Sequence, residues 1–177
     1  MLRLYSSSKG FPFSALPAVY RDSLRASGAF QYPEEPEAQQ EALAESDFLS
    51  YIRLDFFPRQ GSLYALWELG GKPVSAARIE PYRDGVLLSG LETAPDFRGR
   101  GCASCLLEHL LEVIGRQGIP RVYSHVRKDN SPSLAVHKKC GFGVYKTTAV
   151  YLDGSADSRS YTLLLDFEKK LDFSRNM

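Results

Sequence analysis

The amino-acid sequence predicts an α/β fold built around a mixed β-sheet. Strand-like and helix-like segments follow one another in the order strand, two helices, three strands, helix, strand, helix and two strands. Gly70 and Gly71 separate two apolar segments, which indicates a tight β-hairpin. A glycine-rich turn at residues 98–103 joins an apolar strand to an amphipathic helix, which is a common connection in α/β proteins.

The length and composition are typical of one globular domain spanning residues 1–177. A formal net charge of +1 argues against nucleic acid as a partner, because proteins that bind phosphate backbones usually carry a clear basic excess. No apolar segment is long enough to cross a bilayer, and the first residues lack the apolar core of a signal peptide, so no membrane partner is expected. Three cysteines do not form a disulfide framework. We therefore expect a cytoplasmic protein.

The first third of the chain predicts a short strand followed by two helices. Residues 2–5 form the strand, and residues 13–26 carry apolar side chains at helical spacing. Gly28 is expected to end this first helix. The second helix covers residues 37–57, is rich in Ala, Glu and Gln at its start, and is expected to end before Pro58.

The rest of the chain begins with a meander of three strands at residues 62–69, 72–82 and 86–93. The helix that opens at the glycine-rich turn extends to about Gln117, because Gly118 favours the end of a helix. The remaining elements are a strand at residues 121–127, a helix at 131–140, and strands at 143–152 and 160–167.

The turn at residues 98–103 has features that suit a pyrophosphate. Gly99 and Gly101 leave backbone N–H groups uncovered, and the following helix adds the positive end of its dipole. Arg98 and Arg100 place two positive charges in the same turn. The turn is not a P-loop, because no Lys-Ser or Lys-Thr pair follows the glycines, and its glycine spacing departs from the dinucleotide-binding fingerprint.

Two motifs stand in a fixed order in the second half of the chain. The first is Arg98-x-x-Gly101-x-Ala103, and the second is NSPSLAVHKKCGF at residues 130–142. The first motif resembles the acyl-CoA-binding signature R/Q-x-x-G-x-G/A of the GNAT acetyltransferase superfamily. The second resembles the family's N-x-x-A-x-x-L-Y-x-x-x-G-F signature. The order of the predicted elements is also similar to that of the family from end to end.

This resemblance implies a mixed, mostly antiparallel central sheet of about six or seven strands flanked by about four helices. The fourth and fifth strands, residues 86–93 and 121–127, are expected to splay apart. The resemblance also implies an N-acetyltransferase that uses acetyl-CoA as co-substrate and no metal. The acceptor would be the primary amine of a small molecule or a peptide, attacking the thioester directly in a ternary complex. Dimers are common in the family, so a homodimer stays open.

The resemblance assigns the contacts to acetyl-CoA. Backbone N–H groups at residues 100–103 would hold the pyrophosphate, and the pantetheine arm would follow the fourth strand near Leu91 and Thr93. The N–H of one of these two residues would also stabilise the oxyanion of the tetrahedral intermediate. Asn130 would bond to a pantetheine amide. The full predicted set is Leu91, Thr93, Arg98, Gly99, Arg100, Gly101, Cys102, Ala103, Asn130 and Ser133.

His137 stands where the family usually has a tyrosine that protonates the departing CoA thiolate. Transfer of a proton from an imidazolium to a thiolate with a pKa of about 8.5 runs downhill, which favours His137 as the general acid. However, only a minority of histidines with a pKa of about 6.5 are protonated at neutral pH. The alternatives are a side chain that merely contacts CoA and one on the helix surface.

The general base is harder to assign. The family often places a glutamate on the fourth strand, whereas alternation puts Ser89 at the inward position here, on one face with Leu87 and Leu91. Glu92 would point the other way unless a β-bulge rotates it. Glu80 and His125 are further candidates for the base, and for each candidate a surface ion pair or a core contact is the competing explanation.

Two other functions fit the same residues. The histidine at the usual tyrosine position and the missing carboxylate at the inward position favour an acyl-CoA-binding or sensing module without catalysis. Cys102 and Cys105 form a C-x-x-C pair at a helix start, as in thiol redox proteins. Cys105 and His109 could supply half of a zinc site, but no second pair has the spacing of ligands, so no metal is expected.

The acceptor cleft is expected near the aromatic side chains at residues 48–57 and 145–151. The sequence does not separate an aminoglycoside, a polyamine, an amino acid or a peptide N-terminus as the acceptor.

Overall fold

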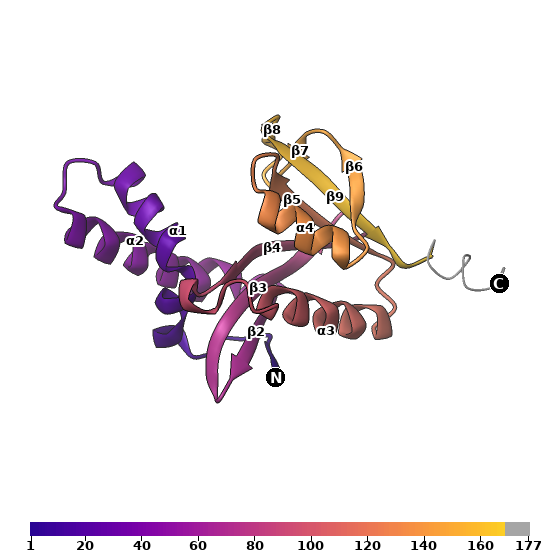
Figure 1. The fold of residues 1–177 in the computed structure, drawn as a ribbon, viewed down its shortest axis with the longest axis horizontal. Helices are drawn as coiled ribbons and strands as arrows, with labels where there is room; N and C mark the ends of the chain where they lie inside the picture. Colours follow the sequence, from indigo (N-terminus) through magenta and orange to yellow (C-terminus); the bar gives the residue numbers. More distant parts are fainter. Residues whose placement is uncertain (169–177) are drawn as a thin grey trace.

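The structure, a computed structural model, describes residues 1–168 and contains a seven-stranded β-sheet (Figure 1). The strands lie in the order β1-β2-β3-β4-β5-β9-β6, and every neighbouring pair is antiparallel except β4 and β5. This confirms the predicted mixed, mostly antiparallel sheet. The strands are β1 Leu2–Tyr5, β2 Leu63–Leu69, β3 Lys72–Tyr82, β4 Gly85–Thr93, β5 Arg121–Arg127, β6 Gly143–Lys146 and β9 Ser160–Asp166.

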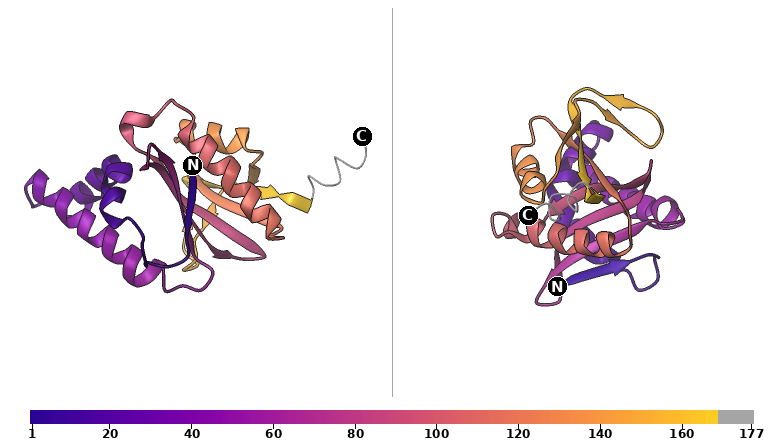
Figure 2. Two further views of the ribbon diagram at one scale, coloured as in Figure 1. Left: turned by 90° about the horizontal axis from the view of Figure 1, so that it is seen from below. Right: turned by 90° about the vertical axis from the view of Figure 1, so that its right-hand side faces the viewer.

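Helices cover both faces of the sheet, as Figure 2 shows. On the α1/α2 face, α1 (Leu16–Gln31) and α2 (Glu37–Tyr51) pack with side chains of β2 and β3. On the α3/α4 face, α3 (Cys102–Arg116) and α4 (Ser131–Lys139) cover a second core. The buried side of α3 confirms the predicted amphipathic helix; it consists of Leu106, Leu107, Leu110, Leu111 and Ile114.

A β-bulge interrupts the pairing of β3 with β4. Between the pairs Ala76–Glu92 and Arg78–Ser89, β4 has two residues where β3 has one. The first of the two, Gly90, has a φ of +57°, a left-handed conformation that glycine adopts without strain. The ladder resumes after the bulge with its side chains shifted by one position.

Beyond the bulge, the side chains of β4 therefore point to the opposite faces of the sheet from those expected by simple alternation. Leu87 packs with tyrosines of β3 and β5, whereas Leu91 packs against the core beneath α3 on the opposite face. The predicted common face of Leu87 and Leu91 is wrong for this reason. Glu92 is turned to the α1/α2 face, where its carboxylate accepts a hydrogen bond of 2.6 Å from the Ser23 hydroxyl.

The parallel strands β4 and β5 separate after a short paired segment. Val86, Leu87 and Leu88 pair with residues 122–124 of β5, and no pair follows them. Beyond that point both strands line a common cavity of about 190 Å³, which we call the splay cavity. The predicted splay is confirmed.

The first helix is longer than predicted. Residues 13–15 form a 3₁₀ turn, and α1 then continues through Gly28 to Gln31. Gly28 does not end the helix; a Cβ at this position would lie 2.5 Å from the carbonyl oxygen of Gln40 in α2. Gly28 thus permits the close approach of two helices. The second helix ends as predicted, through a π-helical turn at Ile52–Phe56.

The strand predicted at residues 143–152 is interrupted. It forms β6 and a separate short strand, β7 (Ala149–Val150), which pairs with β8 (Ala156–Asp157) in a second, two-stranded sheet. β8 lies in the segment between the two strands predicted at residues 143–152 and 160–167. The other boundaries agree with prediction to within one or two residues.

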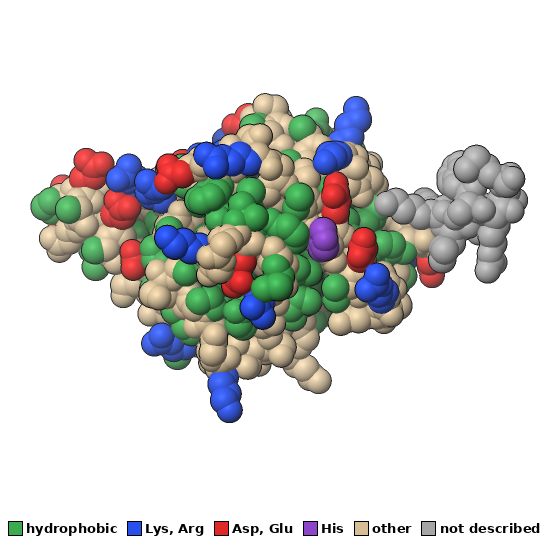
Figure 3. Space-filling view, turned by 60° about the horizontal axis from the view of Figure 1, so that its bottom comes forward, with side chains coloured by type: hydrophobic (Ala, Val, Ile, Leu, Met, Phe, Trp, Pro, Cys, Tyr) green, Lys and Arg blue, Asp and Glu red, His purple; other side chains and the backbone are tan. Residues whose placement is uncertain are grey.

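On the face shown in Figure 3, Lys and Arg side chains are interspersed with Asp and Glu side chains and do not gather in one basic area. Within residues 1–168, no helix is both long enough and apolar enough to span a bilayer.

Replacing Gly28 with alanine is predicted to destabilise the fold by about 1–3 kcal/mol, because the new methyl group meets the backbone of α2. Gly115→Ala is the matched control, since this glycine also lies within a helix but its Cβ would meet only the Phe167 ring at 3.4 Å. The control should be neutral or more stable by up to about 1 kcal/mol. Urea denaturation measures both changes, and equal stability of the two variants would contradict the close approach of α1 and α2.

Candidate functional site

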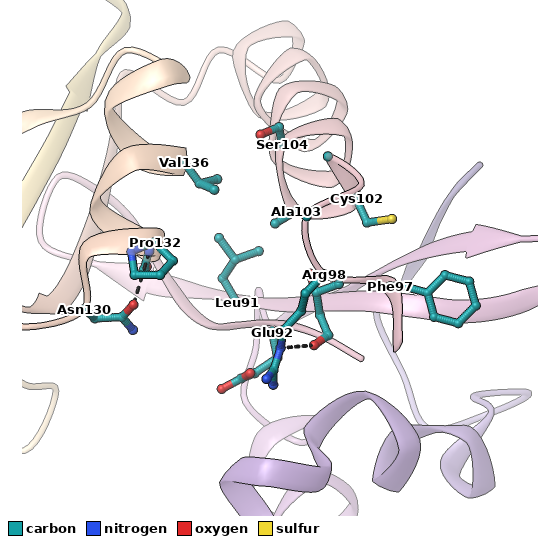
Figure 4. A pocket seen from close by; sticks show the side chains of 14 residues that line it. Leu91, Glu92, Phe97, Arg98, Cys102, Ala103, Ser104, Asn130, Pro132 and Val136 are labelled. Carbon is teal, nitrogen blue, oxygen red and sulfur yellow. Dashed lines mark hydrogen bonds between the residues drawn. The ribbon is translucent and has the colours of Figure 1, made fainter. Parts of the chain in front are cut away.

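A cavity of about 680 Å³ lies between the end of β4, the start of α3 and the start of α4 (Figure 4). We call it the β4–α3 cavity. All but one of the predicted contacts to acetyl-CoA line it, the exception being Arg100. The lining residues among those predicted are Leu91, Thr93, Arg98, Gly99, Gly101, Cys102, Ala103, Asn130 and Ser133.

The turn before α3 presents uncovered backbone N–H groups to this cavity. Gly99 and Gly101 have φ values of +71° and +77°, and a Cβ on either would point into open space. Among residues 1–168, the N–H groups of residues 99–104 have no hydrogen-bond acceptor. Because the first N–H groups of a helix have no partner within the helix, this turn can bind an anion.

The two arginines of the turn have different positions. The Arg98 guanidinium donates to Asp22 of α1 at 2.6 Å and to the Thr93 carbonyl at 3.2 Å, the second of which is drawn in Figure 4. Arg98 therefore joins the turn to α1 while it lines the cavity. Arg100 is exposed and lies over the Phe97 ring, at 5.3 Å from the ring centroid.

The start of α4 forms the opposite wall. Asn130 is the N-cap of α4, and its side-chain oxygen accepts a hydrogen bond of 3.1 Å from the Ser133 N–H. In Figure 4, Asn130, Pro132 and Val136 of this segment stand across the cavity from Leu91 of β4. The second motif of the sequence thus meets the first motif across one cavity.

His137 is buried, with 1% of its surface exposed, and borders the splay cavity. Its Nδ1 lies 2.8 Å from the carbonyl oxygen of Ser133, so Nδ1 carries a hydrogen and donates it. Its Nε2 lies 2.9 Å from the hydroxyl of Ser124, and in the neutral ring this nitrogen accepts the hydroxyl hydrogen. Burial lowers the pKa of His137 below the ordinary 6.5, although the bond to Ser133 opposes this shift. The effect of burial is the larger one, so the neutral imidazole is favoured.

Glu92 lies where three cavities meet. It lines the β4–α3 cavity, the splay cavity and a third cavity of about 370 Å³ between α1, α2 and the sheet, which we call the helix-side cavity. The bulge in β4 gives Glu92 this position, as the sequence analysis allowed. Glu80, the other carboxylate considered, is buried in an ion pair of 2.7 Å with Arg59 and lines none of these cavities.

His125 faces the splay cavity from β5. Its ring makes edge contacts with Tyr82 and Tyr151, at centroid distances of 5.7 and 5.2 Å. Burial and the nearby charge of Arg83 lower the pKa of His125, so the neutral form is favoured. Its Nε2 is buried without a hydrogen-bond partner among residues 1–168.

Sequence reasoning missed several side chains around the helix-side cavity, among them Arg78 and Tyr20. The Tyr20 hydroxyl donates to the Gly90 carbonyl at 2.7 Å, and burial raises the pKa of Tyr20 to about 12. The one available signal was Gly90 itself, because a glycine within a strand often marks a bulge. Of the aromatic segments expected at the acceptor cleft, Phe48 and Tyr51 line this cavity.

Within residues 1–168, no group of three or more His, Cys, Asp and Glu side chains could hold a metal ion. Cys102 is buried and borders the β4–α3 cavity, Cys105 is partly buried, and no disulfide joins them. His109 Nδ1 lies 2.8 Å from the carbonyl oxygen of Cys105.

This α/β protein has a bulge in β4, a separation of β4 from the parallel strand β5, and uncovered N–H groups at the adjacent start of α3. A protein of this class can hold a long anionic ligand in an extended conformation. The chain belongs to the Acetyltransferase (GNAT) family, whose model matches residues 19–142.

Individual proteins are similar to this chain only at low sequence identity. The ribosomal protein bS18-alanine N-acetyltransferase of Escherichia coli strain K12 is 28% identical over 89 residues, which are 49% of this chain and 60% of that protein. N-alpha-acetyltransferase 20 of Dictyostelium discoideum is 29% identical over 141 residues, 72% of this chain and 78% of that protein. The PaiA N-acetyltransferase of Thermoplasma acidophilum, solved with coenzyme A, shares the fold with a TM-score of 0.65 at 17% identity, over 94% of this chain and 99% of that one.

The free energy of unfolding is predicted to fall as the pH drops below 6.5. His125 and His137 have lowered pKa values in the folded state, so the unfolded chain binds more protons below 6.5 and folding becomes less favourable. Each group contributes a slope of up to about 1.4 kcal/mol per pH unit. Denaturation between pH 8 and pH 5 should show a shallower fall for His137→Gln than for His109→Gln, an exposed control; identical slopes would refute the burial of a neutral His137.

Proposed function

We propose that the protein is an N-acetyltransferase that transfers acetyl from acetyl-CoA to a primary amine of a small molecule or a peptide, in a ternary complex. The observation that carries the proposal is the position of Glu92, at which the anion-binding cavity, the splay cavity and the helix-side cavity meet. Two reactants that enter from opposite faces of β4 can therefore come together at one carboxylate.

The β4–α3 cavity suits acetyl-CoA as the co-substrate. The uncovered N–H groups at residues 99–104 would hold the pyrophosphate, and the guanidinium of Arg98 would add a charge-assisted contact. Leu91 and Thr93 offer the backbone of β4 to the pantetheine arm, and Asn130 offers its side-chain amide. The cavity is large enough for a substantial part of such a molecule.

The proposed chemistry needs no metal. The neutral amine attacks the thioester carbonyl, the C–N bond forms, and the C–S bond breaks to release the CoA thiolate. A β4 N–H, that of Leu91 or Thr93, stabilises the oxyanion; both residues line the β4–α3 cavity beyond the point at which β4 separates from β5. Glu92 accepts the amine proton, directly or through a water molecule. His125 is the alternative base.

The proton for the departing thiolate has two sources in this proposal. His137 supplies it only in the imidazolium form, which its burial disfavours at neutral pH. Water supplies it otherwise, since a thiolate with a pKa of about 8.5 leaves without full protonation. The general-acid role of His137 stays a prediction, with a contribution confined to acidic pH.

A second candidate function is an acyl-CoA-binding module without catalysis. The hydrogen bonds that occupy both ring nitrogens of His137 favour it. The experiment that separates the two functions is measurement of CoA release from acetyl-CoA across a library of primary amines, with calorimetric titration of acetyl-CoA in parallel. Release with at least one amine supports the transferase; stoichiometric binding without release supports the module; the absence of binding contradicts both.

Gly101→Ala is predicted to weaken acetyl-CoA binding by at least about tenfold, because Gly101 lines the β4–α3 cavity and its left-handed backbone disfavours any residue with a Cβ. Gly118→Ala is the matched control: Gly118 also has a positive φ, +73°, and open space around its Cβ, but lies at the far end of α3. Both variants should lose about 1–2 kcal/mol of folding free energy. Equal acetyl-CoA affinity of the two variants, measured by calorimetry, would rule out the turn as the pyrophosphate site.

Glu92→Gln is predicted to lower kcat by about a hundredfold or more if Glu92 is the base, while acetyl-CoA affinity changes little. His125→Gln should then lower kcat by less than tenfold. Steady-state CoA release with any accepted amine measures both values. The opposite ranking would assign the base to His125, and normal turnover in both variants would leave proton transfer to water alone.

A further inference from the structure

Three buried polar atoms without hydrogen-bond partners lie in a row across β3, β4 and β5. They are Nε of Arg78, Oγ of Ser89 and Nε2 of His125, and the absence of partners holds for residues 1–168. Arg78 and Ser89 are direct partners in the antiparallel pair of β3 and β4. Leu88 of β4 pairs with Ser124 of β5. Ser89 and His125 are the next residues along these two parallel strands, so they stand across the splay from each other.

These atoms share the α1/α2 face of the sheet. Arg78 lines the helix-side cavity, and Ser89 and His125 line the adjoining splay cavity. Buried polar groups are nearly always hydrogen-bonded in folded proteins, so a run of three that are not calls for a ligand or ordered water. Arg78 can only donate and the Ser89 hydroxyl can donate, so the row suits a ligand group that accepts hydrogen bonds.

Arg78 also lacks a salt-bridge partner in the part of the chain that the structure describes. Within residues 1–168 no carboxylate forms an ion pair with it, and its guanidinium carbon lies 5.4 Å from the ring centroid of Tyr51. The acidic side chains nearby have other partners: Glu80 pairs with Arg59, and Glu92 accepts from Ser23. A guanidinium is the side chain best shaped to bind a carboxylate, because its planar fork matches the two oxygens.

The bulge places this guanidinium beside the reaction centre. A Cβ on Gly90 would lie 2.8 Å from both Nε and Nη2 of Arg78, so the guanidinium packs directly on the bulge. Glu92, two residues further along β4, lines the same helix-side cavity. One small molecule can therefore place its amine at Glu92 and an anionic group at Arg78.

We propose that the acceptor is an amine that also carries a carboxylate, as amino acids do, and that Arg78 binds this carboxylate. The inference rests on the proposed acetyl transfer and names the acceptor class for it. Tyr20, Phe48 and Tyr51 form the aromatic walls against which the rest of the acceptor lies. Arg78 is thus a specificity-determining residue, and Ser89 donates a second hydrogen bond to the carboxylate.

The test compares α-, β- and γ-amino acids with their carboxamides as acceptors, by CoA release from acetyl-CoA. Aminomethylphosphonate is included as an amine with a different anion. The variants are Arg78→Gln, Arg78→Lys and the control Arg53→Gln. Arg53 also lies over an aromatic ring, at 4.6 Å from the Phe13 centroid, but does not line the helix-side cavity.

The expected result is a preference in kcat/KM of about tenfold to a hundredfold for the carboxylate over its carboxamide in the wild type, the range of a charged hydrogen bond. Arg78→Gln should abolish this preference, Arg78→Lys should retain part of it, and Arg53→Gln should leave it unchanged. No preference in the wild type, an equal loss for both members of each pair in Arg78→Gln, or a preference for the phosphonate would each overturn the proposal.

A binding measurement separates this proposal from that of acetyl transfer. N-acetylglycine and N-acetyl-β-alanine are titrated calorimetrically, beside their carboxamides, onto the CoA-loaded wild type and Arg78→Gln proteins. Carboxylate binding that depends on Arg78, without CoA release from any amine, upholds the carboxylate site and refutes the transferase. CoA release without preference refutes the carboxylate site alone. If neither CoA release nor carboxylate binding is observed, both proposals are refuted.

Discussion

The rest of the site depends on the bulge in β4. One extra residue turns Leu91 to the α3/α4 face and Glu92 to the α1/α2 face, so a single strand serves a cavity on each side. The Tyr20 hydroxyl fixes the bulge through the Gly90 carbonyl, and Tyr64 donates in turn to Tyr20 at 3.0 Å. Gly90 cannot be replaced without strain, because its φ is positive and the Arg78 guanidinium occupies the space of a Cβ.

The elements that were predicted well from the sequence are those whose conformation is determined by residues close together in the chain. The hairpin at Gly70 and Gly71, with φ values of +56° and +78°, and the glycine-opened α3 follow from residues adjacent in the chain. The cavity lining beside α3 was predictable for the same reason, helped by the second motif, which contains α4. Gly28 was misinterpreted because its reason lies in another helix: the same residue type ends a helix or permits helix packing, and only the tertiary contact decides.

The catalytic side of the site could not be predicted in this way. Whether Glu92 faces one cavity or the other depends on the register between β3 and β4, which is a property of two strands. The burial of His137 and its bond to Ser124 depend on how α4 lies on β5, so three roles for His137 stayed open from the sequence: general acid, CoA contact or surface residue. Arg78 was not singled out from the sequence, because only the folded structure shows its buried Nε without a hydrogen-bond partner among residues 1–168.

Two ion pairs cross from α1 to the turn that precedes α3: Arg98 with Asp22 at 2.6 Å, and Arg21 with Asp96 at 3.1 Å. The same helix carries Tyr20 and Ser23, which line the helix-side cavity. α1 therefore connects the segment that precedes α3 to the wall of the helix-side cavity. An anion that competed with Asp22 for the Arg98 guanidinium would remove one of these two ion pairs. Any effect of that anion on binding in the helix-side cavity would, by thermodynamic reciprocity, be matched by an equal effect in the opposite direction.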